Sequence, residues 1–343
     1  MPAPIITKPN QHFDATTYTG NGGTQSVTGV GFQPDFVWIK DRVAADYHWW
    51  TDAIRGATKT LHSNATTAET TQATSLTAFG SSGFTLGSDA SVNRNSDTFV
   101  SWNWLGANTT VSNTSGTITS TVSANTTAGF SIVSYTGTGV AATIGHGLGV
   151  APSMIICKNR TDAENWPVYH RTLGASAYIL LNSAAAALTS NNTSWNGVTP
   201  TTTVFSVQTD NRTNGSGDAM IAYCFAEVKG FSKFGSYTGN GSSDGTFVYT
   251  GFKPAFVMVK STGAGANWLM QNNKTLGYNA SNSELYANLT NAEVTADRAD
   301  LLSNGFKARI NSGENNSSVV TYIYMAFAEN PFVSSTQIPV TAR

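Results

Sequence analysis

The stretch PDFVWIK at residues 34–40 recurs in altered form as PSMIICK at 152–158 and as PAFVMVK at 254–260. In each copy a proline precedes a mainly apolar run that ends in a lysine. Proline cannot donate a hydrogen bond to a β-ladder, so it marks the start of a strand. A short apolar run without alternation is typical of a strand buried on both faces. The sequence therefore predicts three equivalent buried strands.

Further residues keep their order and spacing around this stretch. A YTGNG or YTGTG motif begins 16, 17 and 17 residues before the three prolines, at Tyr18, Tyr135 and Tyr237. After each proline comes a phenylalanine with an aromatic residue 18 positions beyond it: Phe84 and Trp102, Phe205 and Tyr223, Phe306 and Tyr324. Several anchors in one order at near-constant spacing indicate an internal repeat of three copies.

The composition between these anchors favours β-structure. Thr, Ser, Asn and Gly supply the polarity, while charged residues make up only 11% of the 343 residues, against about 25% in typical domains. Turn-forming residues separate strand-sized runs, as in GNGG at 20–23 and SSDG at 242–245. We therefore expect an all-β protein of three tandem antiparallel β-sandwich repeats, each of about 100 residues and jelly-roll or lectin-like in form.

The anchors also divide the chain. The expected segments are an N-terminal arm (1–13), repeat 1 (14–106), a linker (107–128), repeat 2 (129–229), repeat 3 (230–332) and a C-terminal tail (333–343). The linker is rich in Thr, Ser and Asn, so it can be a flexible tether or an extended strand along a neighbour. As a tether, it would let repeat 1 stand apart while repeats 2 and 3 touch.

Two local patterns give further expectations. The run FVSWNW at 99–104 alternates in part between polar and apolar residues, which predicts a closing strand with one packed and one solvated face. Residues 293–302 are the best candidate for a short helix.

Charge and hydropathy argue against several classes of protein. The chain has 19 Lys and Arg residues against 20 Asp and Glu residues and no basic cluster, so we expect no nucleic-acid partner. No apolar run reaches the roughly 18 residues of a membrane helix, and residues 1–13 lack the apolar core of a secretory signal. Cys157 and Cys224 fit no zinc motif, so they are expected as small buried side chains or as a bridge between two strands.

No catalytic, cofactor or metal site is recognisable from motifs. The five histidines form no HExxH pair, so we expect them at scattered surface positions. Asp35, Asp41, Asp46 and Asp52 cluster in repeat 1, yet loop solvation explains them more simply than a catalytic carboxylate pair does. A calcium ion bound by loop oxygens is the alternative.

Aromatic residues just after the buried strand are the candidate binding residues. The set consists of Tyr47, His48, Trp49, Trp50, Trp166 and Trp268. Exposed tryptophan can stack on a sugar ring or form a protein interface. Because a tryptophan recurs at this place in each copy, a core or edge-covering role is favoured for the set, and the additional Trp49 is the better functional candidate.

Several strings resemble a family of uncharacterised domains found in structural proteins of tailed bacteriophages, notably marine phages. They are YTGNG (18–22), GFQPDFVWIK (31–40), RGATK (55–59), GFTLG (83–87), WNWLGANTT (102–110) and FAENPF (327–332). Repeat 2 lacks RGATK and matches less closely. The resemblance implies a location on the virion, and it carries no catalytic residue to transfer.

The resemblance implies a non-enzymatic virion surface protein, such as a subunit of a tail fibre, spike or other appendage involved in host attachment. The alternatives are a capsid decoration protein and a carbohydrate-binding module that recognises a host receptor. The expected partners are other virion proteins, further copies of the chain with a trimer favoured, and a host surface glycan. A depolymerase is the least favoured interpretation, because such an enzyme uses paired acids.

Overall fold

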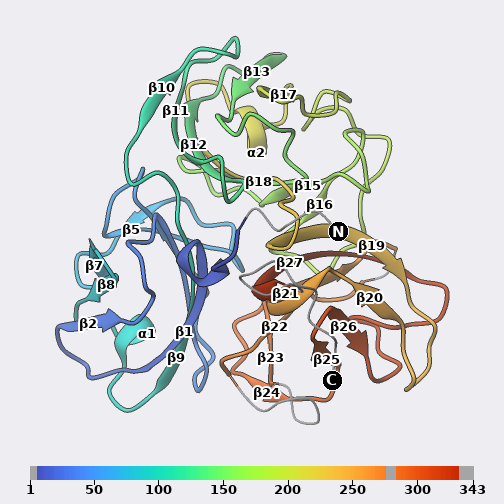
Figure 1. The fold of residues 1–343 in the computed structure, drawn as a ribbon. Coiled ribbons are helices and arrows are strands. Elements are labelled where there is room, and N and C mark those ends of the chain that lie inside the picture. The colour runs from blue at the N-terminus through green and yellow to red at the C-terminus, as the bar shows by residue number, and fades with distance from the viewer. Residues whose placement is uncertain (1–5, 264, 276–282, 332–343) are drawn as a thin grey trace.

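The computed structural model describes residues 6–263, 265–275 and 283–331, with 43% strand and 3% helix. Figure 1 shows three lobes around a common centre. We define lobe 1 as residues 6–106, lobe 2 as residues 107–229 and lobe 3 as residues 230–331. Each lobe contains one large and one small antiparallel sheet. Within the described residues, no helix is both long enough and apolar enough to cross a membrane.

Lobe 1 begins with the 3₁₀ helix η1 (Pro9–Gln11), and its large sheet has the order β1-β9-β3-β4-β5-β6. These strands are β1 (Phe13–Thr19), β3 (Phe36–Asp41), β4 (Trp49–Asp52), β5 (Lys59–His62), β6 (Thr70–Thr71) and β9 (Thr98–Trp104). The small sheet, ordered β2-β8-β7, consists of β2 (Gln25–Thr28), β7 (Leu76–Gly80) and β8 (Gly83–Leu86). The helix α1 (Ala90–Asn93) precedes β9.

Lobe 2 repeats this plan with an extension at one edge. Its large sheet, ordered β10-β11-β12-β18-β14-β15-β16, consists of β10 (Val111–Asn113), β11 (Ser120–Asn125), β12 (Phe130–Thr136), β14 (Met154–Asn159), β15 (Pro167–His170), β16 (Ile179–Leu180) and β18 (Ala219–Phe225). Its small sheet pairs β13 (Ala142–Gly145) with β17 (Val204–Val207). The helix α2 (Asn211–Asn214) precedes β18.

Lobe 3 has the same plan without that extension. Its large sheet, ordered β19-β27-β21-β22-β23-β24, consists of β19 (Ser232–Thr238), β21 (Phe252–Ser261), β22 (Leu269–Asn272), β23 (Ser283–Tyr286), β24 (Val294–Thr295) and β27 (Thr321–Pro331). Its small sheet, ordered β20-β26-β25, consists of β20 (Phe247–Tyr249), β25 (Ala299–Leu302) and β26 (Gly305–Ala308). Residues 293–302 thus contain strands β24 and β25, so the helix prediction is wrong.

The predicted buried strands are β3, β14 and β21, and they lie inside the three large sheets. Every residue of β3 and β14 is buried, as the apolar runs predicted. In β3, Phe36 and Trp38 face a core shared by all three lobes, whereas Val37 and Ile39 pack in a second core with residues of the lobe's own small sheet. β14 and β21 divide their side chains in the same way. Two apolar faces explain the missing alternation.

Three aromatic rings mark the middle of the shared core. Trp104, Phe225 and Phe327 occupy the same register position opposite β3, β14 and β21. Their ring centroids lie 6.1 Å (Trp104 to Phe225), 5.6 Å (Trp104 to Phe327) and 6.0 Å (Phe225 to Phe327) apart. These nearly equal separations place a pseudo-threefold axis between the rings. We call this set the axial triangle.

Each lobe also donates an equivalent backbone hydrogen bond to the next lobe. Three N–H groups donate to three carbonyl oxygens at 2.9 Å: Glu69 to Arg160, Ala187 to Thr262, and Glu293 to Arg42. The acceptors lie two positions after the lysines of the buried strands. Because the third bond joins lobe 3 to lobe 1, the lobes form a closed ring, and the expectation that repeat 1 could stand apart is wrong.

Residues 107–128 contribute to lobe 2. Strands β10 and β11 continue its large sheet beyond β12, with Val122 paired to Val133. Both valines are buried in the core of lobe 2. Of the two expectations for this segment, the strand is confirmed and the tether is wrong, because apolar side chains tie the segment to the sheet. The predicted tail at 333–343 and residues 1–5 of the arm lie outside the described residues.

The closing strand β9 has no solvated face. Ser101 and Asn103 are wholly buried, and Asn103 Nδ2 donates to Ser101 Oγ (3.0 Å) and to the Asp14 carbonyl oxygen (3.1 Å). The alternation of polar residues in this strand therefore reflects hydrogen bonding inside the lobe. The prediction of one wet face is wrong.

The YTGNG motif docks on a buried asparagine in each lobe. The Oδ1 atoms of Asn93, Asn214 and Asn316 accept from the backbone N–H groups of Asn21 (2.9 Å), Thr138 (2.8 Å) and Asn240 (3.1 Å), respectively. The motif tyrosine donates its hydroxyl to the carbonyl oxygen just before that asparagine. A Cβ on Gly20 would lie 2.1 Å from the Arg94 carbonyl oxygen, so the close approach requires glycine. The motif has a structural role in this contact.

Candidate functional site

Most of the predicted binding residues lie in the cores. Tyr47 is exposed over 44% of its surface. The buried members of the set are His48, Trp49, Trp50, Trp166 and Trp268. A buried indole cannot stack on a sugar that arrives from solvent. The structure therefore places Trp49 in the core beside the small sheet of lobe 1 and not on the surface.

Strand pairing shows that the counterpart of Trp166 and Trp268 in lobe 1 is His48, although residue type had suggested Trp50. These three residues directly precede β15, β22 and β4. The backbone N–H groups of His48, Trp166 and Trp268 donate to Oδ1 of Asn64 (2.9 Å), Asn182 (3.1 Å) and Asn288 (2.8 Å), respectively. Matching by residue type therefore selected Trp50, two positions after the equivalent residue His48.

Both tryptophans join one lobe to the preceding one. Trp166 Nε1 donates to the carbonyl oxygens of His62 (3.1 Å) and Ala65 (3.0 Å) in lobe 1. Trp268 Nε1 donates to the Leu180 carbonyl oxygen (2.8 Å) in lobe 2. Their indoles are therefore elements of the junctions between lobes.

His48 occupies the same place with different chemistry. Its Nδ1 accepts a hydrogen bond from Trp38 Nε1 at 2.8 Å. Burial lowers the pKa of His48 well below its ordinary value, and the charge of Lys40 acts in the same direction. The imidazole is accordingly neutral and serves as a buried acceptor.

The other histidines and the cysteines are also mostly internal. His62, His146 and His170 are buried, contrary to the expected surface positions. Burial lowers the pKa of His62 and of His170 to about 4. Cys157 and Cys224 are buried free thiols, which is the first of their two expected states.

The clustered aspartates of lobe 1 have partners. The contacts are Arg94 with Asp41 (3.5 Å) and Asp46 (2.8 Å), Arg55 with Asp52, and the Gly106 N–H with Asp35 Oδ2 (2.7 Å). In the described part of the chain, no three His, Cys, Asp or Glu side chains are grouped so that they could hold a metal ion. These carboxylates act as structural charges.

The lysine that precedes the last residue of each buried strand is itself buried. Lys40, Lys158 and Lys260 are wholly inaccessible to solvent. Lys158 Nζ donates to the Thr66 carbonyl oxygen of lobe 1 (3.1 Å), and Lys260 Nζ to the Ala184 carbonyl oxygen of lobe 2 (2.9 Å). Burial lowers the pKa of all three lysines to about 8. Two of these ammonium groups thus join neighbouring lobes through backbone oxygens.

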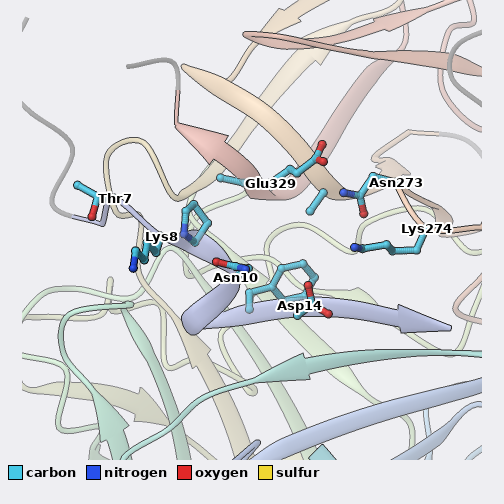
Figure 2. A pocket seen from close by; sticks show the side chains of 11 residues that line it. Thr7, Lys8, Asn10, Asp14, Asn273, Lys274 and Glu329 are labelled. Atoms are coloured by element: carbon cyan, nitrogen blue, oxygen red, sulfur yellow. The ribbon is translucent and has the colours of Figure 1, made fainter. Parts of the chain in front are cut away.

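The best candidate for a ligand site is a pocket of about 270 Å³ where lobe 3 meets the start of lobe 1 (Figure 2). Its lining includes Asn10, Phe13 and Asp14 from lobe 1, and Ala255, Asn273, Lys274 and Glu329 from lobe 3. Figure 2 shows Asn273 and Lys274 extending from lobe 3 toward Asn10 and Asp14. Sequence reasoning missed this site because its two walls are more than 200 positions apart and form no motif.

Two polar groups of the pocket bear on what it can bind. Burial raises the pKa of Asp14 to about 6, although the Thr16 hydroxyl, which donates to Asp14 Oδ2 at 2.7 Å, and the Lys274 charge both lower it. Asn273 Oδ1 is buried and accepts no hydrogen bond. Other buried acceptors of this structure also lack a donor, so Asn273 Oδ1 matters here because its side chain lines the pocket. The pocket therefore offers acceptors to any bound molecule.

Comparison with known proteins gives one match. A family model described as a domain of unknown function (DUF7483) matches residues 8–331, so the chain belongs to this family. The match spans all three lobes. No curated protein and no solved structure matches the chain.

Proposed function

We propose that this member of the DUF7483 family is a non-enzymatic structural protein on the surface of a bacteriophage virion, as a subunit of a tail fibre, spike or other appendage. The observation that carries the proposal is the closed ring, in which the buried histidines, the buried lysines and the clustered aspartates of lobe 1 serve contacts within and between lobes. The strings that resemble phage structural proteins support the location. The host surface is the proposed target of attachment.

We further propose that the three lobes are copies of one lectin-like β-sandwich. The same order of five strands in each large sheet supports this, as do the equivalent hydrogen bonds of the YTGNG motif. Cores between each large sheet and its small sheet support it as well.

The threefold arrangement of the lobes in the ring is relevant to how the protein would assemble on the virion. Symmetric fibres are often trimers, and closed symmetry constrains how subunits meet. We propose that a single chain, with its internal pseudo-threefold axis, suits a threefold-symmetric virion partner. Light scattering on the purified protein tests this: a monomer mass supports it, and a trimer mass favours the threefold homo-oligomer instead.

Quantitative mass spectrometry of purified virions tests the proposed location. We expect peptides of this chain at a few to tens of copies per particle, as for a tail appendage. Hundreds of copies would favour a capsid decoration protein instead. Absence from particles that contain the other structural proteins would contradict both.

A further inference from the structure

We propose that the pocket between lobes 3 and 1 binds a single neutral sugar ring. This inference goes beyond the virion assignment and does not depend on it. It also differs from binding by exposed tryptophans, because the walls consist of amide, carboxylate and ammonium side chains over a small apolar floor. Figure 2 shows the polar side chains that line this space.

A comparison with the next junction explains why the pocket exists. Between lobes 2 and 3, Glu227 forms ion pairs with Arg171 (2.9 Å) and Lys233 (3.4 Å). Strand register gives the counterparts of Arg171, Glu227 and Lys233 at the junction of lobes 3 and 1 as Asn273, Glu329 and Asp14. A long cation is replaced by a short amide, and the second cation by an acid. The same ion-pair cluster cannot form there, and Glu329 instead pairs with Lys253 of its own lobe (2.8 Å).

The junction of lobes 1 and 2 is filled in another way. Asp35, the counterpart of Ala255, accepts from Ser123 Oγ of strand β11 (3.3 Å) and from the Gly106 N–H (2.7 Å). At the junction of lobes 3 and 1 this position carries only the methyl group of Ala255, which lines the pocket. Two of the three related places are thus occupied by side-chain contacts of the protein, and the third is hollow.

The polar groups of the pocket favour a hydroxylated ligand. Asn273 Oδ1 lacks a donor, and the Asp14 carboxylate is a further acceptor. Lys274 supplies a donor, and the amides of Asn10 and Asn273 add both kinds of group. A sugar hydroxyl can donate to one of these groups and accept from another. The two ammonium groups of the lining, Lys8 and Lys274, are balanced by the two carboxylates of Asp14 and Glu329, which favours a neutral ligand over an ion.

The size limits the ligand to one ring. The volume of about 270 Å³ lies just below the roughly 300–1,000 Å³ of typical small-molecule sites. A longer glycan could place one terminal residue there and leave the rest in solvent. One ring held by a few hydrogen bonds corresponds to a Kd in the millimolar range, or about 3–4 kcal/mol of binding free energy.

Saturation-transfer difference NMR on the full chain tests the proposal, with glucose, galactose, mannose and N-acetylglucosamine as separate probes. We expect at least one of them to bind with a millimolar Kd. Asn273→Arg should abolish that binding, because the arginine can pair with Glu329 as Arg171 pairs with Glu227 and would fill the pocket. Asp14→Asn, which exchanges an acceptor for a donor at constant shape, should weaken it about fivefold to tenfold.

Asn95→Ala is the matched control, because Asn95 is exposed in lobe 1 and does not line the pocket. It should bind as the wild type does. Thermal unfolding of each variant verifies that the fold is kept, and wild-type binding by Asn273→Arg or no binding of any probe at tens of millimolar would overturn the proposal. Neither result would affect the virion assignment, which rests on particle composition.

Discussion

The junction between lobes 1 and 2 and the junction between lobes 2 and 3 share the same backbone hydrogen bond, but they differ in their side chains. In the first, Arg160 pairs with Glu69 (2.9 Å), and Asp52, which pairs with the buried Arg55 inside lobe 1, accepts a hydrogen bond from the Tyr223 hydroxyl of lobe 2 (2.7 Å). In the second, the counterparts of Glu69 and Arg160 are Ala187 and Thr262, which cannot form an ion pair. The backbone hydrogen bond is 2.9 Å long in both.

This difference separates the interactions that occur at every junction from those that occur at only some of them. The backbone bond and the shared apolar core occur at all three junctions, so they determine the geometry. Ion pairs occur at two of these equivalent positions, including Arg42 with Glu293 (2.7 Å) at the third junction. An ion pair at this position is therefore an addition, because the junction of lobes 2 and 3 forms without it and carries the Glu227–Lys233 pair (3.4 Å) elsewhere.

The axial triangle should show the largest effect of mutation. Trp104→Ala is expected to lower the free energy of unfolding by about 5 kcal/mol, because truncating a buried Trp costs about 3–5 kcal/mol and this one contacts two other lobes. Phe225→Ala and Phe327→Ala should cost nearly as much. Chemical denaturation measures all three. A much smaller loss for one of them would show that the lobes do not share the core equally.

Removal of Arg55 should destabilise the junction of lobes 1 and 2 almost as strongly. Arg55→Met leaves Asp52 buried without its cation, and breaking a buried pair in this way costs about 3 kcal/mol or more. The double variant Asp52→Asn/Arg55→Met should recover part of the loss, because no buried charge remains. Equal stability of the single and double variants would contradict the role of the pair.

Acid should weaken the junction of lobes 2 and 3 through His170. Its folded-state pKa of about 4 lies below the ordinary 6.5 because of burial. The unfolded chain therefore binds a proton that the folded chain does not, and stability falls as the pH drops from 6.5 toward 4. The raised pKa values of Asp14, Asp35 and Asp41, which result from burial, act in the opposite direction.

The variant His170→Asn isolates this contribution, because asparagine is the natural residue at the equivalent position 272 of lobe 3. Its loss of stability between pH 7 and pH 4.5 should be smaller than that of the wild type by about 2 kcal/mol. Urea unfolding at the two pH values measures it. Identical losses would show that His170 takes no part.

The smallest effect should come from installing the missing ion pair. The double variant Ala187→Glu/Thr262→Arg gives the junction of lobes 2 and 3 the residues of the other two. We expect a gain of about 0.5–1 kcal/mol, because a partly exposed pair contributes little. Urea unfolding at low and high salt would show the gain only at low salt. Either single variant is the control and should give no gain.

The sequence predicts the elements of this protein better than their arrangement. The three buried strands and the high β content are confirmed. A strand that is buried on both faces produces a continuous apolar run, which can be recognised in the sequence. The side of a sheet that a residue faces is harder to predict, because one inserted or deleted position reverses it. Tyr324 matches Trp102 and Tyr223 in spacing, yet strand register aligns Met325 with them, and Tyr324 lies in the core of lobe 3.

The shared core and the pocket could not be predicted for a related reason. Burial of Trp166 depends on contacts with lobe 1, and no local pattern records these. The pocket depends on the absence of contacts, at residues such as Asn273 and Ala255 that look ordinary in the sequence. Only a comparison of the three junctions in the structure shows that the side chains lining the pocket differ from those at the equivalent positions of the other two junctions.

Closure of the ring within one polypeptide has an evolutionary consequence. In an assembly of identical subunits, a single nucleotide change alters every interface at once, and a harmful change is multiplied. Here each interface is encoded by its own stretch of gene, so one can diverge while the others preserve the architecture. The pocket beside Asn273 lies at one junction, and the hairpin of β10 and β11 belongs to one lobe. Independent divergence of the three lobes would produce such differences.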